Sequence, residues 1–204
     1  MPPHPLVTAV VIGGLAKEAI DRLDIRRLLD VGLPQDFNEI VVVAVIVAAR
    51  SLVGASALWL LRDRINGKAV VRLMVGLMTL TAVGVAMLAQ IDVLALAALG
   101  LVLHGGSWVA SEPIVAAWTN TFASSRQRAT VHSFVGQAEA FGEIGGGIAL
   151  GVVAQAAGVP TAMTISAILF GLAALVMSRA HHRWDESVAL VDGDGPPQGP
   201  VPAS

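Results

Sequence analysis

Six long stretches of apolar residues follow one another along the chain, separated by short polar or glycine- and proline-containing segments. A mostly apolar stretch of about 18 residues or more is long enough to cross a bilayer as a helix. Only 14% of the 204 residues are charged, whereas a typical soluble domain has about 25%. The sequence therefore predicts an all-α membrane protein with six transmembrane helices. The predicted spans are residues 6–23, 38–61, 71–90, 93–119, 129–157 and 160–178.

The composition also limits the classes of function and the domain organisation. The net charge of −2 gives no reason to expect a nucleic-acid partner, and the absence of cysteine excludes disulfides and thiol chemistry. No pattern indicates a metal or another cofactor. We expect one transmembrane domain over residues 1–183 and a disordered cytoplasmic tail over 184–204, which is rich in glycine and proline. The first span has no basic segment before it, so we interpret it as a retained helix, not a signal peptide.

Basic residues in the connecting segments predict the orientation in the membrane. If the N-terminus is cytoplasmic, the outer loops hold only Arg26 and Arg27. The inner segments then hold eight basic residues: Arg62, Arg64, Lys68, Arg72, Arg126, Arg128, Arg179 and Arg183. Short cytoplasmic loops are enriched in Lys and Arg. We therefore expect a multi-pass protein of the plasma membrane with both termini in the cytoplasm.

Charged residues lie inside four of the six spans. A charge at the centre of a bilayer costs at least about 2.5–3.5 kcal/mol unless it faces a bundle interior or a water-filled cavity. The third and sixth spans carry no charge in their interiors, so we expect these two to face lipid and the other four to share a polar interior. The charged residues of those four spans are Lys17, Glu18, Asp21, Arg22, Arg50, Glu112, Glu139 and Glu143.

Arg50 lies near the middle of the second span, at an estimated depth close to the membrane midplane. Arginine is always protonated in proteins, so it needs an acidic partner or water there. Glu139 lies at a similar depth in the fifth span and is the nearest candidate partner. Two interpretations stay open: a structural ion pair that joins two helices, or a site that binds solute or protons.

Glu139 and Glu143 are four residues apart, which places both carboxylates on one face of the fifth helix. Two acids close together in a low-dielectric environment favour protonation of at least one of them, as a proton carrier requires. Alternatively, one neutralises Arg50 and the other reaches water. On the first helix, Lys17 with Asp21 and Glu18 with Arg22 form two pairs at the same spacing. Their role is either structural, which we favour, or part of the ion pathway.

The fourth span carries His104, Trp108 and Glu112 on one helical face. An aromatic ring between two titratable groups suits a cavity wall that binds an amphipathic solute, although such a stripe is also compatible with ordinary packing. Pro113 removes one backbone hydrogen bond and allows a kink at that depth. In the fifth span, four glycines at small-xxx-small spacing predict close approach of another helix: Gly142, Gly146, Gly147 and Gly151.

The segment Gly54-Ala55-Ser56-Ala57 is similar to the glycine–serine motif of six-helix rhomboid proteases. The second glycine is missing, however, and the serine lies in the second span. Histidine is also absent from the sixth span. We therefore expect no enzyme.

Several local patterns resemble the C-terminal half of a Major Facilitator Superfamily transporter. Residues 14–23 (GLAKEAIDRL) resemble the family's seventh helix, and residues 117–120 (AWTN) through 126–133 (RQRATVHS) resemble the junction of its tenth and eleventh helices. Asp63, Arg64, Gly67 and Lys68 resemble its signature turn between the second and third helices of a half. The two triplets of spans, each ordered charged, charged, uncharged, also fit an inverted repeat of three plus three helices.

The resemblance implies one half of a twelve-helix bundle and secondary active transport of a small-molecule solute by alternating access. The coupling ion would be H⁺ or Na⁺, and efflux of an amphipathic compound is one expected direction. The partner would be another six-helix half, either a separate chain or a second copy, because the chain is expected to be a truncated or split product or half of a two-subunit assembly. The rival expectation is a six-helix membrane scaffold, or an inactive fragment, that transports nothing.

Overall fold

A computed structural model describes the chain except for residues 1–3, 35, 37, 66–68, 122–127 and 194–204. The described residues form six α-helices and one short 3₁₀ helix, and they contain no strand. In chain order these elements are α1 (His4–Asp30), α2 (Glu39–Leu61), η1 (Arg62–Arg64), α3 (Ala69–Gln90), α4 (Leu94–Thr121), α5 (Arg128–Ala157) and α6 (Val159–Gly193).

Five helices are long and apolar enough to cross a membrane: α2, α3, α4, α5 and α6. The first helix, α1, does not meet this criterion among the described residues, although it is 27 residues long. Its charged residues between Lys17 and Asp30 lower the hydropathy of its second half. The five helices agree with the expected all-helical membrane protein. That α1 also spans the membrane stays a prediction.

The first helix continues past its predicted end at residue 23, so residues 24–30, expected in a loop, are helical. Arg26 and Asp30 form an ion pair one turn apart (3.3 Å), which supports this last part of α1. Gly32 then ends the helix with φ 104°. The amides of Gly32 and Leu33 donate to the carbonyls of Leu29 and Leu28, a Schellman motif that requires a left-handed residue.

The last helix is also longer than predicted. It continues to Gly193, so residues 184–193, which were expected to be disordered, are helical. The glycine- and proline-rich pattern that suggested disorder begins at Gly193 and Gly195. Residues 194–204 of the predicted tail lie outside the described part of the chain.

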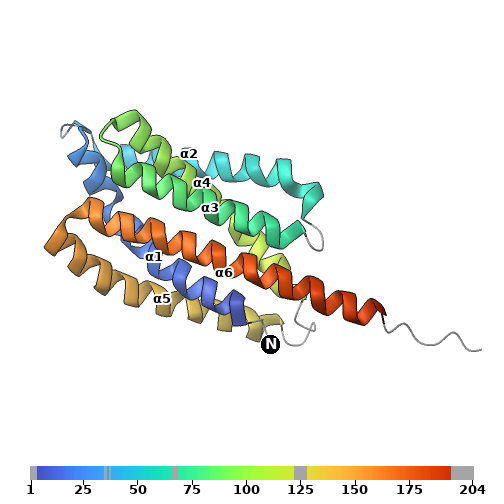
Figure 1. The fold of residues 1–204 in the computed structure, drawn as a ribbon. Helices are drawn as coiled ribbons and strands as arrows, with labels where there is room; N and C mark the ends of the chain where they lie inside the picture. The colour runs from blue at the N-terminus through green and yellow to red at the C-terminus, as the bar shows by residue number, and fades with distance from the viewer. Residues whose placement is uncertain (1–3, 35, 37, 66–68, 122–127, 194–204) are drawn as a thin grey trace, which may run out of the picture.

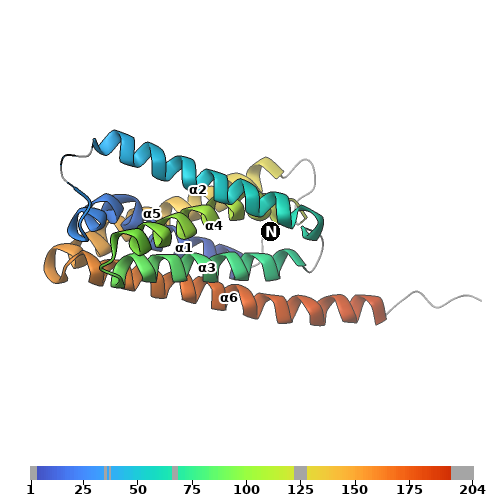
Figure 2. The ribbon, with the colours of Figure 1, turned by 90° about the horizontal axis from the view of Figure 1, so that it is seen from above.

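The helices lie side by side with their axes roughly aligned, and α6 extends beyond the bundle at one end (Figure 1). Helix α1 packs against α5 and α6, and α3 packs against α4 and α6. Helix α2 packs mainly against α4 and lies at the edge of the molecule, as the view from above shows (Figure 2). Thus α1, α3, α4 and α6 form the centre, while α2 and α5 flank it.

The hydrophobic core is formed by the same four central helices. Both clusters of buried apolar residues draw on α1, α3, α4 and α6, and their largest members include Met74, Leu88, Ile114, Met163 and Phe170. The charge-free helices α3 and α6 were expected at a lipid-facing periphery. They instead bury one face in the core and expose the other, because an apolar helix packs equally well against protein and lipid.

Candidate functional site

The charged helices α1, α2, α4 and α5 enclose two adjoining cavities. The first has a volume of about 300 Å³ and lies between α1, α2 and α4, with Arg50 on α2 and His104 on α4 among its lining residues. The second, of about 250 Å³, lies between α1, α4 and α5 and is mostly apolar. Trp108 and Glu112 line both cavities, so the two lie side by side, and we treat them together as the candidate site.

Arg50 lines the first cavity and also a third one, of about 310 Å³, together with Asp21 and Asp24 of α1. Its aliphatic chain lies against Gly105 of α4, where an added Cβ would lie 2.6 Å from Arg50 Cδ. Among the described residues no carboxylate lies within 4.0 Å of its guanidinium. Arg50 and Glu139 therefore do not form the ion pair that their similar depth suggested, and they line different cavities.

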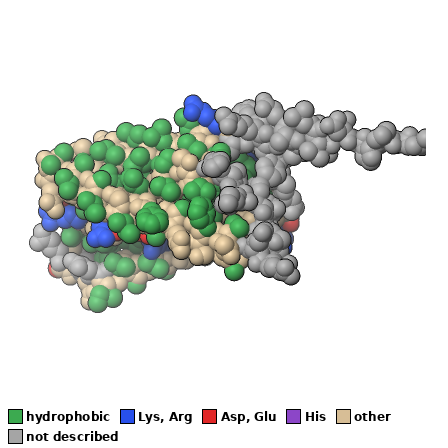
Figure 3. All heavy atoms as spheres, turned by 90° about the horizontal axis from the view of Figure 1, so that it is seen from below, with side chains coloured by type: hydrophobic (Ala, Val, Ile, Leu, Met, Phe, Trp, Pro, Cys, Tyr) green, Lys and Arg blue, Asp and Glu red, His purple; other side chains and the backbone are tan. Residues whose placement is uncertain are grey.

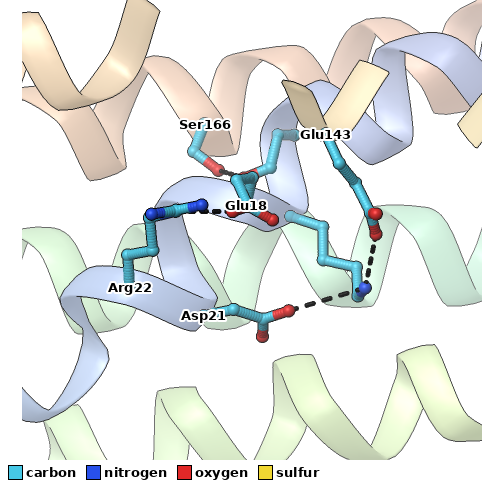
Figure 4. A network of polar contacts seen from close by, with 7 residues as sticks. Glu18, Asp21, Arg22, Glu143 and Ser166 are labelled. Carbon is cyan, nitrogen blue, oxygen red and sulfur yellow. Dashed lines mark hydrogen bonds and ion pairs between the residues drawn. The ribbon is translucent and has the colours of Figure 1, made fainter. Parts of the chain in front are cut away.

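Lys17 of α1 is the cation that pairs with Glu143 of α5. Its Nζ lies 2.7 Å from Glu143 Oε1 and 3.5 Å from Asp21 Oδ2, so it bridges α1 and α5 (Figure 4). The same ammonium group lies 5.6 Å from the centre of the Trp108 ring, within range of a cation–π contact. The i, i+4 pair of Lys17 and Asp21 expected from the sequence is present, with Glu143 as an additional partner.

Glu18 and Arg22 form the second expected pair on α1. They lie beside Gly147 of α5, and Glu143 lies in the same hollow of about 440 Å³. Two residues before Glu18, the backbone carbonyl of Ala16 accepts a hydrogen bond from the hydroxyl of Ser166 on α6 (2.5 Å) (Figure 4). The part of α1 around Ala16 and Lys17 is thus held by polar contacts to both α5 and α6.

His104 and Trp108 are more deeply packed than a solute-facing stripe suggested. His104 is only 3% exposed, and both rings lie against Phe170 of α6, with centroid distances of 5.6 Å and 6.0 Å. Nevertheless, His104 Nδ1 and Trp108 Nε1 are buried and have no hydrogen-bond partner among the described residues. A buried polar atom without a partner is costly, so these two atoms are unusual for residues that only pack.

Glu112 of α4 and Glu139 of α5 both line the second cavity. Neither makes an ion pair with another described side chain. The two acids of α5 therefore have different environments: Glu143 is held by Lys17, whereas Glu139 faces the cavity. Within the described residues, no three His, Asp or Glu side chains lie close enough together to hold a metal ion.

Glycines allow the charged helices to approach closely. An added Cβ at Gly142 or Gly146 would meet the backbone of Val11 or Leu15 on α1, and one at Gly14 would meet the backbone of Glu139. Gly147 lies against the Glu18 side chain, whereas nothing lies within 4 Å of a Cβ at Gly151.

The α2–α4 contact depends on three glycines. Gly54 was considered above only as part of a protease-like motif, and Gly105 and Gly106 were not singled out. The pattern in the sequence that could have indicated this contact is the adjacent pair Gly105-Gly106, one helical turn before Val109. Asp24 was also missed, because it was placed in a loop. It lies on α1 and lines the third cavity with Arg50.

The residues of the expected signature turn lie apart from these cavities. Asp63 and Arg64 are exposed on η1, and Asp63 pairs with Arg62 at 3.7 Å. Arg62 also lies over the ring of Trp59, 5.2 Å from its centre. Gly67 and Lys68 lie outside the described residues.

The exposed surface separates charged from apolar side chains. In the space-filling view, Lys, Arg, Asp and Glu side chains gather along a band between areas where hydrophobic side chains predominate (Figure 3). The most exposed apolar residues are on the flanking helices and include Ile40, Leu52, Phe141 and Ile148. This surface suits a protein that is surrounded by lipid or by another apolar helix bundle.

The fold and the cavities define an all-helical protein with five helices able to span a membrane and a charged interior site. No protein-family model matches the chain, and no curated protein sequence is significantly similar to it.

Proposed function

We propose that this chain is the membrane domain of a secondary active transporter, organised like one half of a Major Facilitator Superfamily transporter. The observation that carries the proposal is the set of three ionisable side chains without ion-pair partners among the described residues, Arg50, Glu112 and Glu139. They come from three helices and line two adjoining cavities. Ionisable groups inside a membrane domain are expensive and usually mark substrate or ion pathways.

The packing of the helices supports an inverted repeat of three plus three. If α1, α2 and α3 correspond to α4, α5 and α6, the contact of α1 with α5 corresponds to that of α4 with α2. The contact of α1 with α6 likewise corresponds to that of α4 with α3, and α3 packs against α6 at the centre. Such a repeat requires α1 to cross the membrane together with the other five helices, which places both termini on one side. The basic residues of the connecting segments favour the cytoplasm as that side.

In this proposal the charged face of α1, α2, α4 and α5 lines the solute pathway and faces a second six-helix half. Alternating access exposes the pathway to one side of the plasma membrane at a time. Glu139, which has no salt-bridge partner, is the proton-carrying group, because a carboxylate held by a cation would stay ionised. Glu143 is already neutralised by Lys17 and holds α5 to α1.

The test is transport in vesicles that contain the chain and any partner half copurified with it. Accumulation of labelled amphipathic cations, anions and neutral compounds is measured under an imposed pH gradient. We expect saturable accumulation of one class, reduced about tenfold or more in Arg50→Ala and Glu139→Gln. Arg128→Ala and Asp36→Asn remove the same charge types at exposed positions away from the two cavities and should transport normally. Unchanged transport in both cavity variants would disprove these assignments.

A second candidate is a membrane scaffold that transports nothing. It is favoured by the mutual neutralisation of Lys17, Asp21 and Glu143, and of Glu18 and Arg22, because these charges need no solute or proton to balance them. The same vesicle experiment separates the two candidates. A scaffold shows no saturable accumulation of any compound at any protein density.

A further inference from the structure

We propose that the cavity between α1, α2 and α4 binds the carboxylate group of an amphipathic organic anion, with Arg50 as the cation that holds it. The inference rests on the proposed function, because it names the chemical class of solute for the same site. It goes beyond that function in assigning the charge of the solute, the residue that binds this charge and the place of its apolar part.

The first argument is the state of Arg50. Its guanidinium is always charged and offers five N–H donors in a planar fork that matches a carboxylate. Neither nearby acid of α1 forms an ion pair with Arg50: Asp21 pairs with Lys17 (3.5 Å), and Asp24, which lines the third cavity with Arg50, accepts from the backbone amide of Ile25 (2.6 Å). Because a cation in a membrane interior needs a counter-charge, Arg50 is the cation of this site that an anionic solute can neutralise.

The second argument is a pair of buried polar atoms without partners among the described residues, on two side chains that line the same cavity. The indole N–H of Trp108 can only donate, and it is buried without a partner. The Nδ1 atom of His104, a residue only 3% exposed, has no partner either. Both residues line the cavity with Arg50. A carboxylate oxygen that reached the indole N–H of Trp108 would accept from a donor that no described residue pairs.

The third argument is the arrangement of the remaining charges around the site. Lys17 is held by Glu143 and Asp21, so it does not compete with Arg50 for a ligand. Glu112 is the one carboxylate of this cavity without a salt-bridge partner among the described residues, and it is exposed and also lines the second cavity. An ammonium group bound at Glu112 would leave Arg50 unbalanced. A carboxylate at Arg50 balances the more buried of the two charges.

The second cavity, of about 250 Å³, provides room for the apolar part of the anion. Its lining is mostly apolar and includes Val10, Met78 and Val115. It adjoins the first cavity, since Trp108 lines both. Together the two volumes fall within the range of about 300–1,000 Å³ that is typical of small-molecule sites. The site therefore fits a molecule with a carboxylate at one end and an apolar or aromatic group at the other.

The test is calorimetric titration of the purified full chain in nanodiscs with three probes of one shape. These are 4-phenylbutyrate, its uncharged amide and the cation 4-phenylbutylamine, with protein-free nanodiscs as the blank. We expect the carboxylate to bind about tenfold or more tightly than the amide, and the amine to bind no better than the amide. Because the comparison uses the unmodified protein, it does not depend on whether a variant folds.

Variants then locate the site. Arg50→Gln should reduce the affinity for phenylbutyrate to that of the amide, while Arg128→Gln should leave it unchanged. Trp108→Phe keeps an aromatic ring but removes the N–H, so we expect a smaller, severalfold loss. Nanodiscs with and without phosphatidylglycerol should give the same affinity. Competition by this anionic lipid would show that Arg50 binds lipid headgroups, and it would overturn the proposal.

Other outcomes would also overturn it. These are equal binding of the carboxylate and the amide, tighter binding of the amine, and absence of binding by all three probes. They can be distinguished from failure of the proposed function. A chain that binds phenylbutyrate at Arg50 but accumulates nothing in vesicles retains the anion site and loses the transporter assignment. A chain that accumulates only cations keeps the transporter assignment and loses the anion site.

Discussion

Arg27 and Arg50 carry the same guanidinium group into the bundle, but their surroundings differ. Arg27 is 5% exposed and donates to the carbonyls of Leu88 and Ala89 (3.0 Å each) and to Asp92 (2.7 Å). It thereby caps the C-terminal end of α3, where carbonyl groups lack helical partners and the helix dipole favours a cation. Arg50 forms no ion pair with any described residue. We therefore assign a structural role to Arg27 and a binding role to Arg50.

The cap gives a prediction for stability. Arg27→Ala removes charge-assisted hydrogen bonds to buried carbonyls, so we expect the free energy of unfolding to fall by about 1.5–3 kcal/mol. The measurement is unfolding of the purified chain by a denaturing detergent, followed by circular dichroism. Arg26→Ala is the matched control, because its side chain is 69% exposed and pairs only with Asp30. It should change stability by at most about 0.5 kcal/mol. Equal effects of the two substitutions would contradict the capping role.

At the scale of the elements, the long apolar runs predicted most helix boundaries to within two residues. The clearest differences are at the end of α1 and the end of α6, where helices continue beyond the apolar run. In α1 the continuation depends on contacts with other parts of the chain, such as that of Arg27 with α3. Hydropathy contains no information on such contacts. For the same reason the sequence placed Arg27 in an outer loop.

Helix α5 provides two adjacent glycines with different surroundings. At Gly146 an added Cβ would meet the backbone of Leu15, whereas at Gly145 nothing lies within 4 Å. Gly146→Ala should therefore separate α1 from α5 and lower the free energy of unfolding by about 1–3 kcal/mol.

Gly145→Ala is the control at the next position of the same helix. It should leave stability unchanged or raise it by roughly 0.5–1 kcal/mol, because alanine favours a helix over glycine. Both variants are compared by the same detergent titration. A loss of stability in Gly145→Ala and none in Gly146→Ala would mean that α5 faces α1 with a different side.

At the scale of the whole molecule, the charge pattern identified which helices share the polar site but not how the charges pair. The sequence suggested Arg50 with Glu139, and the structure pairs Glu143 with Lys17 instead. The depth of each group in the membrane stays a prediction, and depth alone does not determine pairing. Pairing depends also on which helices are neighbours, and α2 packs against α4 while α5 packs against α1. That arrangement follows from glycine contacts across the bundle, which a single sequence shows only as scattered small residues.

The arrangement also predicts which helices meet water in the membrane. The chain has no cysteine, so single cysteines can be introduced without a background. Ser51→Cys on α2 and Ala116→Cys on α4 line the two cavities. Both should react with a membrane-impermeant maleimide in intact or inverted vesicles, since a solute pathway is hydrated.

The controls are Leu80→Cys and Leu172→Cys, at exposed positions near the middle of α3 and α6. They should react at least about tenfold more slowly, because a thiol in hydrocarbon stays protonated and is shielded from the reagent. Faster labelling at Leu80 and Leu172 than at Ser51 and Ala116 would mean that the outer faces of α3 and α6 line the aqueous pathway, and that the charged cavities are closed structural interiors.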